Sequence, residues 1–525
     1  MSKNLAELID ETCRRYGEKP AFSCLGREMS FSEVDRHARA FGAWLQHNTD
    51  LQPGERIAIQ LPNVLAYPVA AYGAIYAGLV LVNTNPLYTK REMQHQFADS
   101  GARALVVLKD IAPSAEAILA DTDIQTVITA PAMFTDQPGD APGNAVDFGR
   151  VLTEGASLEL REDGKQRGSA ELAALQYTGG TTGVAKGAML SHANITANVD
   201  QVYDHFGRFI HEGEEIFVAP LPLYHIYAFT VNMLMFFNFG GLNVLIPNPR
   251  DLDQFVQQIK PYRFTGFAGL NTLFVGLCHH PEFQELDFSA LRLTVSGGTA
   301  TTMAAANAWE KTTGCRISEG WGLSETSPVL TINPPDAQQL GTIGVPLKDT
   351  EIIAVREDGQ RAGVGEPGEL WARGPQVMQG YWNRPEATDE VLTSDGFFKT
   401  GDIGLIQEDG YIRIVDRKKD MILVGGFNVF PNEVENVLTQ HPKVMECAVV
   451  GVPDERSGEV VRAYVVPAEP DFDDASELER HCRESLTAYK VPKQIIFREA
   501  LPKSAVGKVL RKDLRAEAES EAANG

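Results

Sequence analysis

Short apolar runs alternate with amphipathic segments through most of the first 400 residues. Five runs rich in Val, Ile and Leu have the length and composition of buried strands, at 56–62, 79–83, 104–108, 126–129 and 243–247. Residues 31–48 and 198–206 instead carry apolar side chains at helical spacing. Strands and helices that alternate in this way predict an α/β fold with layered, largely parallel sheets.

The pattern changes near residue 400. Residues 404–415 read as a hairpin of two alternating strands around Asp409-Gly410, a favoured turn dipeptide. A dense charge run follows at 416–420, and Pro431 is placed to begin a helix. We therefore predict a large N-terminal domain of layered α/β sheets (1–416) and a small α+β C-terminal domain (417–525). The first twenty residues predict an amphipathic helix rather than a secretion signal, and the polar segment 516–525 is expected to fray.

Two long uncharged stretches raise the question of membrane insertion. Residues 64–82 nominally reach spanning length, but Pro68, Gly73 and Gly78 interrupt them and basic flanking residues are missing. We expect a buried helix followed by a strand. Residues 216–249 are broken by Asn, Pro and a Gly-Gly pair, which favours interior structure or a groove for an apolar ligand.

Charge and cysteine content narrow the class of protein. A formal net charge of -23 disfavours nucleic acid as a partner, because such binders gain affinity by neutralising phosphates. The six cysteines are scattered without a CxxC pair, so neither a disulfide framework nor a zinc site is expected. These features are typical of an acidic cytoplasmic enzyme.

Residues 175–192, LQYTGGTTGVAKGAMLSH, have the composition of a phosphate-binding loop. They depart from the Walker A pattern, since Ala185 precedes Lys186 and Gly187 follows it. The segment after the lysine reads as a strand, and Ser191 is placed to cap the next helix. Glycines let the backbone close around an anion, and the threonines and lysine supply donors and charge. We predict a nucleotide-phosphate loop from Tyr177, Thr178, Gly179, Gly180, Thr181, Thr182, Gly183 and Lys186.

Further candidates follow along the chain. Gly297-Gly298 ends an apolar strand, which alone predicts only a tight turn. Trp321 offers a flat face for a purine, and Glu325 offers a carboxylate suited to magnesium. Asp402 precedes the hairpin, where its carboxylate could accept both ribose hydroxyls, and Lys508 lies in a loop near the C-terminus.

The ordered set YTGGTTGVAKG, PLYH, GWGLSETSP, GYWNRPEATDE, KTGDIG, VDRKKDMILVGGFNVFPNEVE and LPKSAVGKVLRKDLR resembles the adenylate-forming superfamily over essentially the whole chain. Within it, the chain is most similar to bacterial long-chain fatty acid–CoA ligases. Ser324 stands where the family usually has threonine, and Trp321 where it usually has tyrosine. The segment between about residues 130 and 170 is short by comparison, which could affect an entry surface.

The resemblance implies a first half-reaction in which a carboxylate attacks the α-phosphorus of MgATP. It assigns the threonines and Lys186 to the β- and γ-phosphates, and Glu325, with Thr178, to Mg²⁺. Lys508 would bridge the carboxylate and the α-phosphate, beside His225. The remaining nucleotide contacts would come from Gly298, Thr299 and Trp321 at the adenine, from Asp402 and Arg417 at the ribose, and from Gly322 and Ser324.

In the second half-reaction the resemblance implies that the thiol of coenzyme A attacks the adenylate after the small domain rotates about Lys419. Gly425 and Gly426 would line the pantetheine channel, and Lys490 and Lys493 are candidates for the CoA nucleotide. Residues 224–241 and 267–277 would form the acyl tunnel. A homodimer, and peripheral contact with the inner membrane, are left open.

Other functions stay open at this stage. The same scaffold serves CoA ligases for medium-chain or aryl acids, luciferase-like oxygenases, and catalytically silent lipid-binding relatives. Intact Glu325, Asp402, Arg417 and Lys508 argue against the silent relative. The sequence does not fix the acyl chain length.

Overall fold

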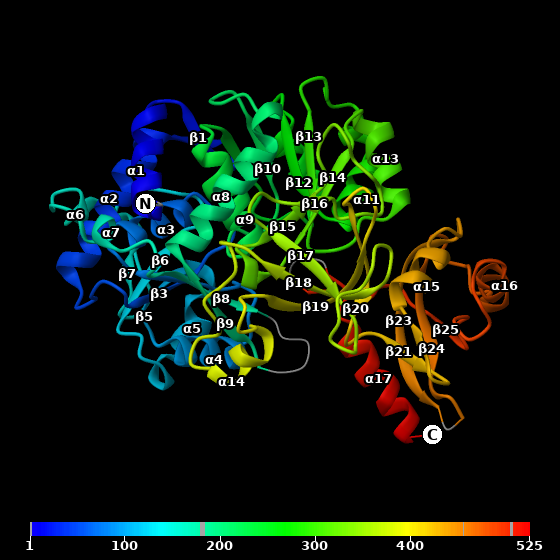
Figure 1. The fold of residues 1–525 in the computed structure, drawn as a ribbon. Coiled ribbons are helices and arrows are strands. Elements are labelled where there is room, and N and C mark those ends of the chain that lie inside the picture. Colours follow the sequence, from blue (N-terminus) through cyan, green and yellow to red (C-terminus); the bar gives the residue numbers. More distant parts are fainter. Residues whose placement is uncertain (1–2, 179–183, 455, 505–507, 525) are drawn as a thin grey trace.

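Two large β-sheets form the framework of the N-terminal part of the chain (Figure 1). The computed structural model describes residues 3–178, 184–454, 456–504 and 508–524. One sheet has the order β7-β6-β5-β3-β4-β8-β9 and is parallel except for the antiparallel pair β8–β9. Its strands are β3 (Arg56–Gln60), β4 (Val80–Asn83), β5 (Ala102–Leu108), β6 (Thr126–Ala130), β7 (Val146–Asp147), β8 (Leu172–Thr178) and β9 (Lys186–Ser191).

The second sheet has the order β16-β15-β14-β13-β12-β10-β11-β1-β2, with parallel pairs from β14 through β1 and antiparallel pairs at both ends. Its strands are β1 (Pro20–Cys24), β2 (Arg27–Ser30), β10 (Ile216–Ala219), β11 (Leu242–Leu245), β12 (Gly266–Gly269), β13 (Leu293–Ser296), β14 (Ile317–Gly322), β15 (Val329–Ile332) and β16 (Val345–Pro346). The predicted α/β class with largely parallel sheets is confirmed.

Helices cover these sheets and fill the space between them. They are α1 (Leu5–Tyr16), α2 (Phe31–Asn48), α3 (Ala66–Tyr76), α4 (Lys90–Ser100), α5 (Ala112–Glu116), α6 (Phe148–Gly155), α7 (Asp163–Gln166), α8 (His192–Phe206), α9 (Ile226–Ala228), α10 (Leu252–Ile259), α11 (Asn271–His279), α12 (Pro281–Gln284) and α13 (Met303–Thr313). The predicted N-terminal helix and the helix over 31–48 are both present. Ser191 caps α8 as predicted, accepting a hydrogen bond from the Asn194 N–H at 3.1 Å.

The two uncharged stretches form interior structure. Every residue of α3 is buried, and β4 follows it, as expected for residues 64–82. Residues 216–249 fold as β10, α9, a fully buried π-helix η4 (Phe229–Phe236) and β11. The Tyr72 hydroxyl of α3 donates to the Met233 carbonyl of η4, which ties the two segments into one core. Among the residues that the structure describes, no helix is both long and apolar enough to cross a membrane.

A smaller antiparallel sheet follows, with the order β17-β18-β19-β20. It consists of β17 (Glu351–Val355), β18 (Gly368–Arg373), β19 (Phe398–Ile406) and β20 (Ile412–Arg417), and α14 (Pro385–Val391) precedes β19. The predicted hairpin is β19–β20, and Gly410 supplies the left-handed residue of its turn, with φ of 84°.

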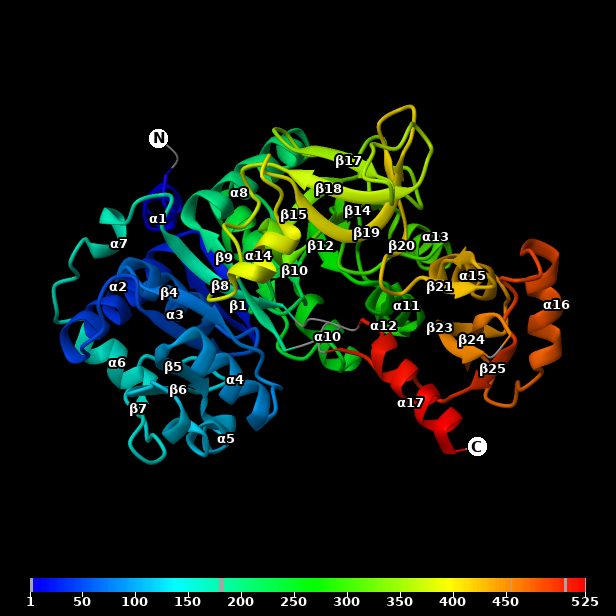
Figure 2. The ribbon, with the colours of Figure 1, turned by 60° about the horizontal axis from the view of Figure 1, so that its bottom comes forward.

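The remaining elements pack around cores of their own, to one side of the larger part (Figures 1 and 2). They are β21 (Ile422–Val424), β22 (Phe427–Val429), α15 (Pro431–Leu438), β23 (Val444–Asp454), β24 (Gly458–Pro467), α16 (Ala475–Ser485), β25 (Gln494–Phe497) and α17 (Arg511–Asn524). Residues of these separate cores begin at Ile422. The boundary between residues 416 and 417 stays a prediction, and it falls at the end of β20.

The expectation that the C-terminal segment frays is wrong for most of its length. Residues 511–524 form α17, which buries Leu514 and Ala518 in a cluster with Val450 and Tyr464. Glu521 also pairs with Arg462 of β24 at 2.8 Å. Local polarity predicted an unsupported tail, whereas packing of Leu514 and Ala518 against the sheet holds the helix in place.

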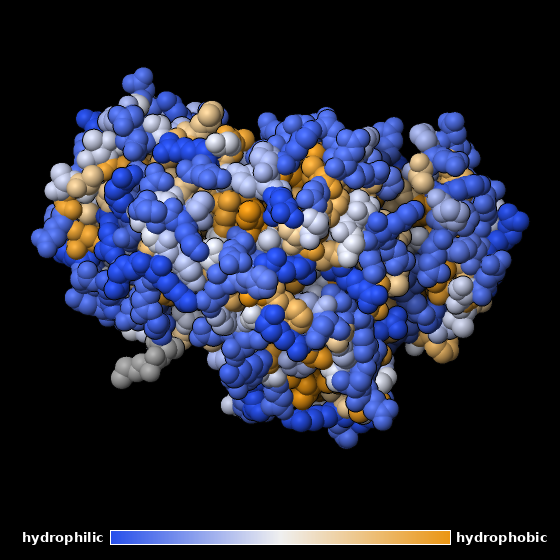
Figure 3. Space-filling view, turned by 90° about the horizontal axis from the view of Figure 1, so that it is seen from above, coloured by the Kyte–Doolittle hydropathy of each residue, from blue (hydrophilic) through white to orange (hydrophobic). Residues whose placement is uncertain are grey.

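The molecular face shown in Figure 3 is mostly hydrophilic, with apolar side chains in small separate groups. Scattered apolar residues of this kind are normal on globular proteins.

Candidate active site

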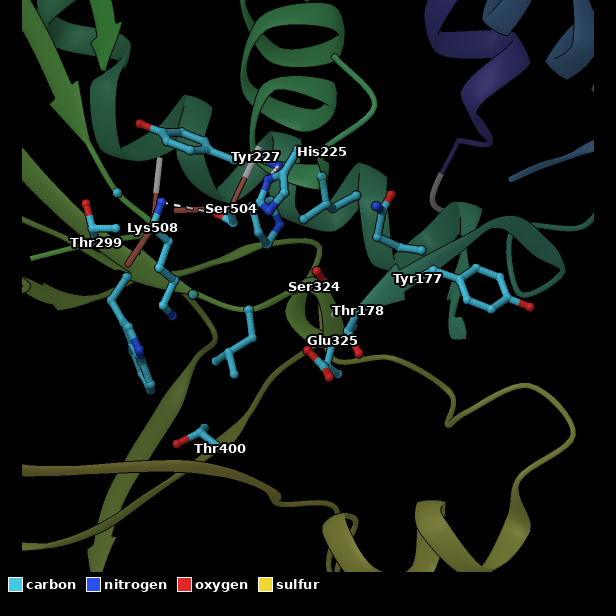
Figure 4. Close-up of a pocket in the computed structure, with 18 of the residues that line it drawn as sticks. Tyr177, Thr178, His225, Tyr227, Thr299, Ser324, Glu325, Thr400, Ser504 and Lys508 are labelled. Atoms are coloured by element: carbon cyan, nitrogen blue, oxygen red, sulfur yellow. Dashed lines mark hydrogen bonds between the residues drawn. The ribbon is translucent and has the colours of Figure 1, made fainter. Parts of the chain in front are cut away.

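A cavity of about 1770 Å³ lies where strand ends of both large sheets meet the β17–β20 sheet and the C-terminal elements. Most of the predicted site residues line it. In Figure 4, Thr178, Ser324 and Glu325 lie on one side, while Lys508, Thr299 and His225 lie on the other. The predicted residues that line the cavity are Tyr177, Thr178, Lys186, His225, Gly298, Thr299, Trp321, Gly322, Ser324, Glu325, Arg417, Lys419 and Lys508.

The two ends of the predicted phosphate loop lie side by side. Thr178 ends β8 and Lys186 begins β9, and the two residues face each other in the antiparallel register. The hydroxyl side chain and the ammonium therefore border the same opening of the cavity. Gly179, Gly180, Thr181, Thr182 and Gly183, also predicted for this loop, lie outside the described residues.

Glu325 lies in a short 3-10 turn, η5 (Ser324–Thr326), between β14 and β15. Its side chain is buried, and the Tyr381 hydroxyl donates to Oε1 at 2.7 Å. Burial raises the pKa of the carboxyl, while the Tyr381 hydrogen bond and the charge of Arg417 oppose the rise. A nearby cation would favour the ionised form in the same way.

Asp402 joins two other predicted residues. It faces Arg417 across the β19–β20 pair, with Oδ1 3.0 Å from Nε, and Oδ2 accepts a hydrogen bond from Trp321 Nε1 at 2.8 Å. The indole edge is thereby fixed at the cavity wall, with its ring available to the cavity. Asp402 itself is buried behind these two partners.

Cations from the C-terminal elements gather at the same place. Burial, followed by the positive charge of Arg417, lowers the pKa of Lys508 to about 7. The same two causes lower the pKa of Lys419 to about 8. The backbone N–H of Lys508 donates a hydrogen bond to the Ser504 hydroxyl at 3.1 Å (Figure 4). Because these ammonium groups repel one another, an anion in the cavity would relieve an existing electrostatic cost.

His225 caps the short helix α9, where Nδ1 accepts a hydrogen bond from the Tyr227 N–H at 3.3 Å. Burial, with a contribution from Lys508, lowers the pKa of the imidazole to about 4. The ring is therefore neutral at pH 7 and adds no charge beside the ammonium.

Part of the cavity lining is apolar, and we call this part the apolar branch. Leu270 is the contribution of the predicted wall 267–277, whereas Phe274 and Leu277 of that segment pack in a separate core. The predicted wall 224–241 contributes several positions, Val231 among them. Other walls come from α8, β13 and β15, which were not predicted. The buried residues of this branch include Val202, Phe206, Val231, Val295, Val329 and Ile332.

Besides Asp402, four predicted positions do not line the cavity. Gly425 and Gly426 lie exposed in the β21–β22 hairpin, both with positive φ. Lys490 is paired with Glu433 at 2.7 Å, and Lys493 is exposed. In this arrangement of the chain, these residues are away from the nucleotide-sized space.

Two models of known protein families together match most of the chain. A model described as AMP-binding enzyme matches residues 9–382, and one described as AMP-binding enzyme C-terminal domain matches residues 433–508. The chain belongs to the AMP-binding enzyme family. This confirms the resemblance of the motif series.

Two curated relatives show how far the similarity of this AMP-binding enzyme extends. A long-chain-fatty-acid–CoA ligase of Salmonella typhimurium is 46% identical over 543 residues, covering 99% of this chain and 96% of the relative. A protein of the same description from Bacillus subtilis is 37% identical and covers 98% and 94%.

Solved structures agree with the fold. ATP-bound MatB from Rhodopseudomonas palustris has a TM-score of 0.87 at 30% identity, covering 98% of this chain and 99% of that one. The anthranilate CoA ligase AuaEII, in complex with anthranoyl-AMP, has a TM-score of 0.90 at 26% identity, covering 99% and 98%.

The residues of this AMP-binding enzyme fit a magnesium ion that is shared with a nucleotide. Mg²⁺ is usually held by one or two carboxylates together with substrate phosphates and water. Glu325 supplies a buried carboxylate, and Thr178 lies beside it (Figure 4). Within the described part of the chain there is no cluster of three or more His, Cys, Asp or Glu that could hold a metal ion.

Tyr381 was not among the predicted site residues, although it lies in the motif GYWNRPEATDE. Its hydroxyl binds Glu325, and its ring centroid lies 5.1 Å from Lys186 Nζ. Its position in a recognised motif was the available signal. Asp99 was also missed, and it accepts hydrogen bonds from both Tyr177 and Arg384 at 2.7 Å. Nothing local marks Asp99, because its partners are 78 and 285 residues away.

Proposed function

We propose that this AMP-binding enzyme is an ATP-dependent long-chain fatty acid–CoA ligase. It forms an acyl-adenylate with release of pyrophosphate, and then an acyl-CoA with release of AMP. The observation that carries the proposal is that one cavity is lined both by Lys186, Arg417 and Lys508 and by the apolar side chains of Val202 and Phe206. The extensive similarity to long-chain-fatty-acid–CoA ligases supports the same conclusion.

ATP occupies the polar part of the cavity in this proposal. Thr178 and Lys186, with Thr181 and Thr182 of the loop, bind the β- and γ-phosphates. The adenine lies against Trp321, near Gly298 and Thr299, while Asp402 and Arg417 hold the ribose. The hydrogen bond from Trp321 to Asp402 supports this division, because it links the purine wall to the ribose group.

The first reaction brings two anions together. A carboxylate oxygen attacks the α-phosphorus, a P–O bond forms, and the bond to the pyrophosphate oxygen breaks. Lys508 places its ammonium between the attacking carboxylate and the α-phosphate, so positioning and charge compensation supply most of the acceleration. Mg²⁺, held by Glu325 and Thr178, would offset negative charge on the phosphates. His225 stays neutral and orients the carboxylate.

The second reaction transfers the acyl group to sulfur. The thiol loses its proton, sulfur attacks the acyl carbon, and the bond to the AMP oxygen breaks. We infer that the C-terminal elements turn about Lys419 to bring Gly425 and Gly426 to the pantetheine. Their present position outside the cavity fits a role in a second arrangement. Lys490 and Lys493 would then meet the CoA nucleotide.

The apolar branch accounts for binding of a featureless chain. Burial of one methylene contributes roughly 0.8 kcal/mol, so about fifteen methylenes contribute on the order of 10 kcal/mol before ordering costs. The branch is lined by aliphatic and aromatic side chains, which match such a substrate.

A ligase for aryl or medium-chain acids is the second candidate. A feruloyl-CoA synthase of Amycolatopsis sp. is 34% identical, covering 93% of this chain and 94% of the relative. Its lower identity makes the fatty acid the better supported substrate.

A substrate series tests the proposal. Purified protein with ATP, Mg²⁺ and CoA should release pyrophosphate and AMP and form thioesters, most efficiently with long saturated acids. Preference for ferulate or short acids would select the second candidate, and formation of ADP would overturn both. A cytoplasmic location stays a prediction of the sequence, and peripheral membrane contact and a homodimer stay open.

A further inference from the structure

The segment 379–384 lies along β9, which is the strand that follows the predicted phosphate loop. The Gln379 N–H donates to the Met189 carbonyl at 3.0 Å, the Met189 N–H donates to the Gly380 carbonyl at 2.9 Å, and the Trp382 N–H donates to the Gly187 carbonyl at 2.8 Å. Tyr381 is thereby held opposite Ala188, two residues beyond Lys186. Its backbone position is set by β9 itself.

The Tyr381 side chain contacts two groups of opposite charge. The hydroxyl donates to Glu325 Oε1 at 2.7 Å, and Lys186 Nζ lies 5.1 Å from the ring centroid. Tyr381 is 8% exposed, so its hydroxyl and ring are largely shielded from solvent. Shielding strengthens a hydrogen bond to a carboxylate and a cation–π contact alike.

The other end of the segment is fixed by Asp99 of α4. The Asp99 carboxylate accepts hydrogen bonds from Arg384 and from the Tyr177 hydroxyl, each at 2.7 Å, and its carbonyl accepts one from Trp382 Nε1 at 3.1 Å. Tyr177 precedes Thr178 at the end of β8. The segment is therefore connected to both strands that border the phosphate loop.

We propose that Tyr381 is a positioning residue for the phosphate end of the nucleotide, with its hydroxyl orienting Glu325 and its ring orienting Lys186. This inference rests on the proposed function, which assigns Glu325 to Mg²⁺ and Lys186 to the phosphates. The hydrogen bond engages Oε1 and so fixes the direction in which Oε2 faces. The aromatic ring limits where the lysine ammonium can lie. One side chain thus sets the geometry of a metal ligand and of a phosphate-binding cation.

Two substitutions separate these contacts. Tyr381→Phe removes the hydroxyl and keeps the ring, whereas Tyr381→Leu removes both. Tyr76→Phe is the matched control, because the buried Tyr76 hydroxyl donates to Asp35 Oδ1 at 2.8 Å in the N-terminal core, away from the cavity. ATP binding is measured by calorimetry without fatty acid or CoA, over a series of Mg²⁺ concentrations.

The Mg²⁺ concentration that gives half-maximal enhancement of ATP binding should be about 10- to 100-fold higher in Tyr381→Phe. Loss of a group that is hydrogen-bonded to a metal ligand typically weakens metal binding by this factor. ATP affinity without Mg²⁺ should stay as in the wild type. Tyr381→Leu should lower that metal-free affinity as well, by about 2- to 5-fold, the effect of one cation–π contact. Tyr76→Phe should match the wild type in both measurements.

An unchanged Mg²⁺ dependence in Tyr381→Phe would overturn the inference, even if Tyr381→Leu does not fold. Equal metal-free affinities of the Leu and Phe variants would overturn the part that concerns Lys186. The wild type is assayed in parallel for acyl-CoA. Failure to form acyl-CoA would count against the proposed function, whereas acyl-CoA formation with an unaltered Phe variant would count only against the role of Tyr381.

Discussion

Asp402 and Arg417 lie opposite each other in the β19–β20 pair, with Asp402 Oδ1 3.0 Å from Arg417 Nε. Arg417 is the last residue of β20 and lines the cavity, while Asp402 lies buried behind it. The pair lies at the end of β20, just before the C-terminal elements begin at β21. Trp321 of the second large sheet joins it through a hydrogen bond to the same carboxylate.

Replacement of Asp402 by Asn tests the ribose assignment. The amide keeps an acceptor for Trp321 but loses the charge that binds Arg417 and that the proposed function assigns to the ribose hydroxyls. Loss of a charged hydrogen bond costs about 1.5–3 kcal/mol, so KM for ATP should rise roughly 10- to 150-fold while kcat changes little. Initial rates over an ATP series provide the measurement, with the exposed Asp358→Asn as control. A KM equal to that of the wild type would remove Asp402 from the nucleotide site.

Lys508→Ala separates the two half-reactions. Without the ammonium, adenylate formation should become undetectable, whereas thioester formation from supplied acyl-adenylate should continue. Pyrophosphate release and thioester formation are measured separately. Lys443, which pairs with Glu477 at 3.0 Å away from the cavity, provides the control variant Lys443→Ala. Equal loss of both half-reactions would contradict the role assigned to Lys508.

The depressed pKa of Lys508, about 7, predicts a pH dependence of adenylate formation. Below the pKa the side chain is a cation, and above it the charge is lost. For pyrophosphate release, kcat/KM for ATP reports the free enzyme and should fall as pH rises through about 7. Bound nucleotide adds negative charge and raises the pKa, so kcat should fall at a higher pH than kcat/KM.

Lys508→Arg provides the comparison for this pH profile. A guanidinium stays protonated through the same range, so the decline at alkaline pH should disappear, whatever the absolute rate. A decline of the same shape in the Arg variant would assign the titration to another group.

Leu514→Ala tests the packing of α17. Leu514 is fully buried against β23 and β24, and large-to-small changes at such sites cost about 2–5 kcal/mol. We expect this loss in the unfolding free energy of the C-terminal elements, measured by denaturant titration. Glu519→Ala on the exposed face of the same helix should stay within about 0.5 kcal/mol of the wild type. Similar stabilities for both variants would mean that α17 is not held by its apolar face.

The sequence by itself determined features that depend on neighbouring residues. Apolar runs of strand length marked β3, β4 and β5, helical spacing marked α2, and Asp409-Gly410 marked the turn between β19 and β20. These predictions succeeded because strand alternation, capping and turn conformation are set by side chains within a few positions. The motif series likewise identified the family, since each motif is a short local pattern.

Only the tertiary structure decided which distant groups meet. Trp321 and Asp402 are 81 positions apart and Glu325 and Tyr381 are 56 apart, and nothing local in the sequence signals those hydrogen bonds. The same holds for α17, whose polar sequence becomes a stable helix because β23 and β24 bury Leu514 and Ala518. A contact of this kind depends on how separate elements pack, and its free energy appears only when the long intervening chain has been ordered.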